Sequence, residues 1–233
     1  MEVIKFAPTR PDYVPLDNIK PQPAKNFIPE WYKKMPNHLE KDEPATELLR
    51  TLNSSTVKRC PSFRDIFKYG IAMPAPCDIY LSATKGEWRW ETPSGIMEIE
   101  YHEDYQFKDH YPNQDVKGVF KLHYPLMVMT PPGWSVMQIP LMYHHNPDWY
   151  FAWGILDSDQ YHDVNPQLIY VSDKRELLIK QGEPLFYFYP YKRAEWEVEM
   201  LEYGDMQDLY RETRWKLSTR FAGRYYKNFR KKS

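Results

Sequence analysis

The stretch from Phe120 to Arg193 constrains the fold of this chain most strongly, because it consists of short apolar runs separated by turn residues. Such runs, with turn chemistry between them, are typical of a buried β-sheet layer. No helical segment alternates with them, so a doubly wound parallel sheet is disfavoured, and we expect a mainly β fold with an antiparallel, jelly-roll-like β-sandwich core. The predicted strands are 119–130, 134–143, 149–156, 166–172, 176–180 and 184–190.

The composition indicates a folded chain with stiff loops. Of the 233 residues, 42% are hydrophobic and 16% are aromatic, which excludes disorder for most of the length. With 21 Pro and only 9 Gly, long helices are disfavoured before the C-terminus, and so are Gly-rich phosphate-binding loops. The net charge of -1 argues against a protein whose whole surface binds a polyanion.

Several signals bear on the cellular compartment. No apolar run approaches the roughly 20 residues that a membrane-spanning helix needs, and the first residues lack the two parts of a signal peptide. We therefore expect a soluble, cytoplasmic protein without membrane contact. Cys60 and Cys77 each lie beside a proline and have no Cys-x-x-Cys partner. Without an export signal, both thiols are expected to be reduced.

Three regions follow from the changes in composition. Residues 1–55 are predicted to be a Pro-rich arm packed on the core, residues 56–193 the β-sandwich core, and residues 194–233 a charged amphipathic helix. The helix is predicted from about Asp205 to about Phe229, because apolar residues recur there at four-residue spacing and acidic residues precede basic ones.

Two smaller elements are predicted inside the core region. Phe63, Ile66 and Phe67 have helical spacing, with Ser62 able to cap a short helix and Gly70 able to end it. Residues 87–92 and 96–101 both alternate apolar and polar side chains around a Pro-Ser-Gly turn. This arrangement predicts a β-hairpin that joins the two segments.

One cluster of imidazoles and carboxylates suggests a metal site. Two histidines and one acid can bind zinc or ferrous iron and leave positions open for substrate. One interpretation uses His102, Asp104 and His162, in the order that metal-binding sheet sandwiches use, and another uses the His144-His145 loop. The same segments are typical of solvated turns, and that interpretation is preferred. No cofactor is therefore predicted, with Fe or Zn as the alternative.

Aromatic and acidic side chains in the central stretch are candidates for lining a ligand pocket, since aromatic rings stack on sugars and bases. The residues concerned are Trp134, Tyr143, Asp148, Asp157 and Asp159. Such residues are more often packed in the core or on the sheet faces, or lie in turns, and this remains the preferred interpretation.

The basic C-terminal tail is the candidate contact for nucleic acid, because cations neutralise phosphates while aromatic rings stack on bases. Its candidate residues are Arg220, Arg224, Tyr225, Lys227 and Arg230. A docked helix with ordinary dipole chemistry explains the same pattern. A protein partner, or self-association through the apolar stripe of the helix, is the other expectation.

Residues 56–193 resemble a family found in bacteria and in T4-like phages of marine cyanobacteria, grouped as a domain of unknown function. The resemblance rests on Cys60-Pro61, Pro74, residues 130–135 (Thr-Pro-Pro-Gly-Trp-Ser), the turn at 154–159, and Gly182-Glu183-Pro184-Leu185 ahead of Pro190. It implies a compact β-sandwich and brings no activity or ligand with it. The proline-rich arm and the C-terminal helix lie outside it.

These observations favour a non-catalytic phage-type protein that acts through protein–protein contacts, as a virion component or a host-directed accessory factor. Its expected location is the host cytoplasm or the virion. One alternative is a metal-dependent jelly-roll enzyme, with non-haem iron or zinc, acting on a small molecule. A second alternative is nucleic-acid binding through the basic aromatic C-terminus.

Overall fold

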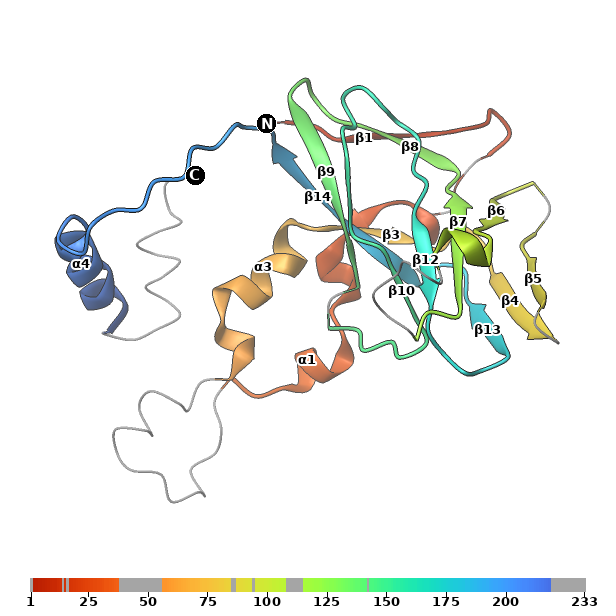
Figure 1. The fold of residues 1–233 in the computed structure, drawn as a ribbon, viewed down its shortest axis with the longest axis horizontal. Helices are drawn as coiled ribbons and strands as arrows, with labels where there is room; N and C mark the ends of the chain where they lie inside the picture. Colours follow the sequence, from red (N-terminus) through yellow and green to blue (C-terminus); the bar gives the residue numbers. More distant parts are fainter. Residues whose placement is uncertain are drawn as a thin grey trace, which may run out of the picture. The chain divides into compact units, whose positions relative to one another are not determined.

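The computed structural model describes residues 2–13, 15, 17–37, 56–84, 87–93, 95–107, 115–141 and 143–218 (Figure 1). The chain divides into two compact units. The first, here called the β unit, comprises residues 1–29 and 68–193, and the second comprises residues 30–67 and 194–233. The N-terminal segment therefore belongs to the β unit up to Pro29, where β1 and β2 pair with strands from the centre of the chain.

The strands of the described residues all lie in the β unit (Figure 1). They are β1 (Lys5–Pro8), β2 (Gln22–Pro23), β3 (Ile71–Pro74), β4 (Ile79–Thr84), β5 (Glu87–Glu91), β6 (Glu98–Tyr101), β7 (Gly118–His123), β8 (Leu126–Met129), β9 (Trp134–Pro140), β10 (Trp149–Phe151), β11 (Gly154–Leu156), β12 (Gln167–Tyr170), β13 (Glu176–Ile179) and β14 (Pro184–Lys192). Short 3-10 helices are η1 (Asp17–Ile19), η2 (Ala24–Phe27), η3 (Val57–Arg59) and η4 (Asp104–Gln106), of which η3 lies in the second unit.

The strands form antiparallel sheets, as predicted. Among the described residues the sheet orders are β1-β8, β10-β12-β7-β6, β11-β9-β14-β3-β2 and β13-β4-β5. The longest strand, β14, pairs with β9 on one side and β3 on the other. This confirms a mainly β protein with antiparallel sheets.

One apolar core takes side chains from all of these sheets, including Leu81, Phe120, Val128 and Phe186. Phe186 of β14 is fully buried, and its ring centroid lies 5.1 Å from that of Phe151 on β10. The alternation of side chains along each strand places apolar residues on the face that points to this core. In β7, for example, every second residue from Gly118 to Leu122 is buried.

Two long predicted strands are each broken into two. The run 119–130 is interrupted at Tyr124-Pro125 between β7 and β8, because proline lacks the amide that a strand ladder needs. The run 149–156 changes sheets, since β10 pairs with β12 while β11 pairs with β9. Both breaks let consecutive strands enter different sheets.

The predicted hairpin of residues 87–92 and 96–101 is wrong. A turn is present, because the amide of Ile96 donates to the carbonyl of Pro93 and the Thr92 hydroxyl donates to the carbonyl of Met97. The two strands diverge from it, however, since β5 pairs with β4 and β6 pairs with β7. The predicted turn therefore connects two sheets and does not close a hairpin.

The second unit holds α1 (Glu30–Lys34), most of α3 (Pro61–Tyr69) and α4 (Gln207–Ser218). The Tyr32 ring stacks on Phe63 at 5.5 Å and contacts Phe67 at the same distance, which joins α1 to α3. Ser62 was predicted to cap this helix but lies inside it, because the helix begins at Pro61, whose missing amide needs no partner in the first turn.

Only part of the predicted C-terminal helix falls on described residues. Helix α4 covers 12 residues, and the predicted continuation to about Phe229 lies outside the described residues. No helix in the part of the chain that the structure describes is both long enough and apolar enough to cross a membrane.

Candidate functional site

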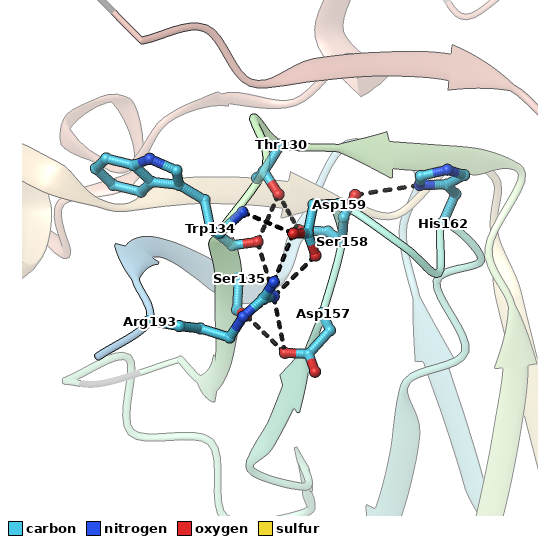
Figure 2. Close-up of polar contacts among 9 residues, drawn as sticks. Thr130, Trp134, Ser135, Asp157, Ser158, Asp159, His162 and Arg193 are labelled. Atoms are coloured by element: carbon cyan, nitrogen blue, oxygen red, sulfur yellow. Dashed lines mark hydrogen bonds and ion pairs between the residues drawn. The ribbon is translucent and has the colours of Figure 1, made fainter. Parts of the chain in front are cut away.

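A dense polar cluster of the β unit gathers where three segments meet (Figure 2). They are the loop between β8 and β9, the turn that follows β11, and Arg193, directly after β14. In the loop, Gly133 has φ +80° and the amide of Trp134 donates to the carbonyl of Pro131. Proline followed by a glycine of positive φ is typical of a type II turn. The turn directs the Gly133 amide towards Asp159, which accepts it at 2.7 Å.

Arg193 and Asp159 form the centre of the cluster. Both terminal nitrogens of the guanidinium donate to the Asp159 carboxylate, one to each oxygen. The Asp159 side chain is only 7% exposed. The Arg193 hydrogen bond and the Gly133 amide lower the pKa of Asp159 to about 2, and Asp159 in turn raises the pKa of Arg193. This carboxylate is therefore ionised in the folded protein and fully engaged.

A second carboxylate lies beside the first one. Asp157 accepts the Ser135 hydroxyl at 2.6 Å and lies 3.3 Å from Nη1 of Arg193. The same Nη1 donates to the Ser135 oxygen at 2.8 Å. The Asp157 side chain is 55% exposed, so it is the open edge of the cluster.

The hydroxyls of the half-buried Thr130 and the buried Ser158 belong to the same cluster (Figure 2). The Thr130 and Ser158 hydroxyl oxygens lie 2.8 Å apart, and Thr130 also donates to the carbonyl of Trp134 at 2.9 Å. Nδ1 of His162 is 3.1 Å from the carbonyl oxygen of Ser158. Because these polar groups satisfy one another, we interpret the cluster as a clamp that fixes the end of β14 to the β9–β11 edge.

Four of the predicted metal ligands, His102, Asp104, His144 and His162, each make a hydrogen bond to a different group. His102 contacts the Gln167 side chain at 2.7 Å, and Asp104 accepts the Tyr101 hydroxyl at 2.6 Å. His144 contacts the Tyr187 hydroxyl at 2.7 Å, and burial lowers the pKa of this imidazole. Among the residues that the structure describes, no three His, Cys, Asp or Glu side chains are grouped to hold a metal ion. The iron or zinc hypothesis stays a prediction.

The loop after β9 has the features of a turn. His145 and Tyr143 both have positive φ. The Asn146 side chain accepts the amides of Asp148 and Trp149, which is the geometry of an Asx turn.

Of the five predicted pocket residues, the structure brings three together. Trp134, Asp157 and Asp159 all meet Arg193, although Trp134 does so through its backbone carbonyl. Asp148 lies elsewhere and pairs with Lys174 at 2.6 Å, while Tyr143 lies in the turn after β9. The predicted nucleic-acid contacts Arg220, Arg224, Tyr225, Lys227 and Arg230 lie outside the described residues.

Sequence reasoning missed the partner of the two acids. From the sequence, Arg193 was used only as the boundary of the predicted core, and Ser135 was used only as the last residue of a turn motif. A weak signal was present: two carboxylates two residues apart in one turn favour a nearby cation, and Arg193 directly follows the last strand.

Comparisons with known proteins identify no family. No family model matches the chain, and no curated protein matches it. Among solved structures, a native EIAV dUTPase gives a TM-score of 0.35 at 8% identity, covering 59% of this chain and 87% of that one. A mutant dUTPase from phage phi11 of S. aureus gives 0.33 at 10% identity, covering 59% and 86%. These low scores carry neither a fold assignment nor an activity to this chain.

Proposed function

We propose that this protein is non-catalytic and acts through protein–protein contacts, with the segment 195–203 as its contact strand. In this proposal the β unit, a jelly-roll-like sandwich, is the scaffold. The phage-type role, as a virion component or a host-directed accessory factor, rests on the sequence resemblance alone and stays a prediction. The observation that carries the proposal is the exposure of the contact strand.

Large apolar side chains of the contact strand are exposed to solvent. Trp196, Val198 and Met200 have exposed fractions of 86%, 88% and 90%. They alternate with Glu195, Glu197 and Glu199, which gives one apolar and one acidic face in an extended chain. Leu201 and Tyr203 are exposed as well.

This pattern is typical of a strand that requires a partner. Among the described residues, the segment 195–203 pairs with no strand. Burying one large apolar side chain stabilises a complex by roughly 1.5–3 kcal/mol. Contiguous exposed apolar side chains mark interaction sites, and strand addition to a sheet edge is one way to cover them.

A second copy of this chain offers a sheet edge of complementary charge. Strand β13 is the edge of the β13-β4-β5 sheet, and it carries the exposed apolar side chain of Leu178. Basic residues lie at both of its ends, namely Arg175 and Lys180. Glu176 lies within β13, so the proposed complementarity rests on the two bases that flank the strand and would pair with the glutamates of the contact strand.

The mass of the full chain in solution tests this proposal. One chain weighs 28.1 kDa, and we expect a larger mass that falls to one chain's mass when Trp196, Val198 and Met200 are all changed to Ser. Light scattering during size exclusion gives the measurement. A chain that ends at Arg193 should behave like the triple variant.

Charge exchange separates pairing at β13 from other contacts. Arg175→Glu should weaken the assembly, and Glu197→Arg added to it should restore the larger mass. Glu2→Gln, at an exposed position outside both elements, is the matched control and should change nothing. A wild-type mass of 28.1 kDa at every concentration would contradict self-association.

The two alternative functions have no specific support among the described residues. The five candidate metal ligands make separate hydrogen bonds or lie in a turn, and the five candidate nucleic-acid contacts are not described. Both alternatives stay predictions.

A further inference from the structure

A pocket of about 690 Å³ lies in the β unit between β5 and β6. These are the edge strands of two different sheets, and they diverge from the turn that was predicted to close a hairpin. Because neither strand pairs with the other, the space between them is open to side chains and solvent. Its lining combines aromatic rings with carboxylates.

Three aromatic rings form the wall of the pocket. Trp88 and Trp90 are two residues apart on β5, so both side chains leave the same face of the strand. The Tyr101 ring centroid lies 6.4 Å from Trp88 and 6.3 Å from Trp90. The buried ring of Phe120 contacts both indoles edge-on and holds them from the core side. Trp90 is 37% exposed, which leaves part of its indole available to a ligand.

Four carboxylates surround these rings: Glu87, Glu100, Glu103 and Asp104. Lys121 lies 3.0 Å from Glu100 and balances its charge, and His123 lies at the same distance from this carboxylate. The other three make the pocket negative, and none of the described residues that line it is a lysine or an arginine. Aromatic faces and carboxylates both attract a positive charge.

We propose that this pocket binds an alkylated ammonium group, with its methyl groups against Trp90 and Tyr101 and its charge facing the acids. A bare metal ion would gain little from the rings, and an anion would be repelled by the carboxylates. A methylated lysine of another protein and a choline-like small molecule share this chemistry. Binding here requires no self-association, so it stands or falls separately from the proposed function.

The test uses choline, its uncharged carbon analogue 3,3-dimethyl-1-butanol, and a blocked trimethyllysine, each titrated into the full chain by calorimetry at low salt. Choline or trimethyllysine should bind at least about tenfold more tightly than the uncharged analogue, since only the cations interact with the ring faces electrostatically. Tighter binding of trimethyllysine would assign a protein ligand, and tighter binding of choline a small molecule. Either result supports the proposal.

Variants place the binding in this pocket. Trp90→Ala should weaken binding by about tenfold, whereas Trp90→Phe keeps a ring face and should retain most of it. Trp153→Ala removes another exposed indole outside the pocket lining and is the matched control. Equal binding of choline and its uncharged analogue would overturn the proposal. So would an unchanged affinity in Trp90→Ala, or no binding of either cation at millimolar concentration.

Discussion

Strand β7 and the contact strand carry the same alternating pattern but place it in different surroundings. Strand β7 pairs with β12 and β6, alternate residues along it are buried, and Phe120 lies in the core. In the contact strand, Trp196 and Met200 alternate with glutamates and stay exposed. Alternation therefore specifies a strand with one apolar face, but it does not specify which chain covers that face.

The largest expected difference is in stability, and it separates the contact strand from the core that Phe120 of β7 shares with Phe186 of β14. Phe186→Ala should lower the free energy of unfolding by about 3–5 kcal/mol, because this ring is fully buried among Phe151, Phe188 and Tyr124. Trp196→Ala should change it by less than about 0.5 kcal/mol in the monomer. Urea unfolding at low protein concentration measures both. Equal effects would show that the contact strand is covered within one chain.

The clamp gives a smaller and pH-dependent effect. Asp159→Asn should lower the Tm by about 2–4 °C at neutral pH, since the ion pair with Arg193 is lost. The folded-state pKa of about 2 lies below the ordinary 3.8, so this stabilisation is present above about 3.8 and is lost as the pH falls towards 2. The difference in Tm between wild type and variant should therefore shrink over that range.

Asp157→Asn is the control for the clamp, because this more exposed carboxylate should matter less. Thermal unfolding from pH 7 down to the lowest pH at which the protein still folds gives the Tm of the wild type and of both variants. A Tm difference that stays constant with pH would contradict the role of an ionised Asp159.

The smallest expected effect is a difference in alkylation between the two cysteines, which are both free thiols. Cys77 in the β unit is buried, and burial raises the pKa of its thiol to about 11. Cys60 in the second unit is exposed. At pH 8, iodoacetamide should therefore modify one thiol per folded chain and two in urea, as counted by mass spectrometry. Equal rates for both thiols in the folded chain would contradict the burial of Cys77.

Much of the β unit could be predicted from sequence, because its strands carry local signals. Runs such as 184–190 contain enough apolar residues to indicate a buried strand, and β14 covers that run. The ends of strands were harder: the break at Pro125 has a local signal in the proline itself, whereas the break near Trp153 depends on which sheet the chain enters next. The hairpin at 87–101 failed for the same reason: a turn fixes local geometry but does not choose the partner strand.

The candidate sites depended even more on distant contacts. Asp157 and Asp159 were identified as acids in a turn, but their partner Arg193 lies 34 residues from Asp159 in sequence. The pocket between β5 and β6 exists only because those strands join different sheets. Local patterns therefore indicated the residue types, and the topology determined which of them meet.

Hydrogen exchange of the contact strand tests the central claim most directly. Alternate backbone amides of residues 195–201, those that point to the paired strand, should exchange slowly at protein concentrations that favour assembly and quickly at high dilution. They should exchange quickly at both concentrations when Trp196, Val198 and Met200 are changed to Ser. Fast exchange in the wild type at all concentrations would contradict strand addition by this segment.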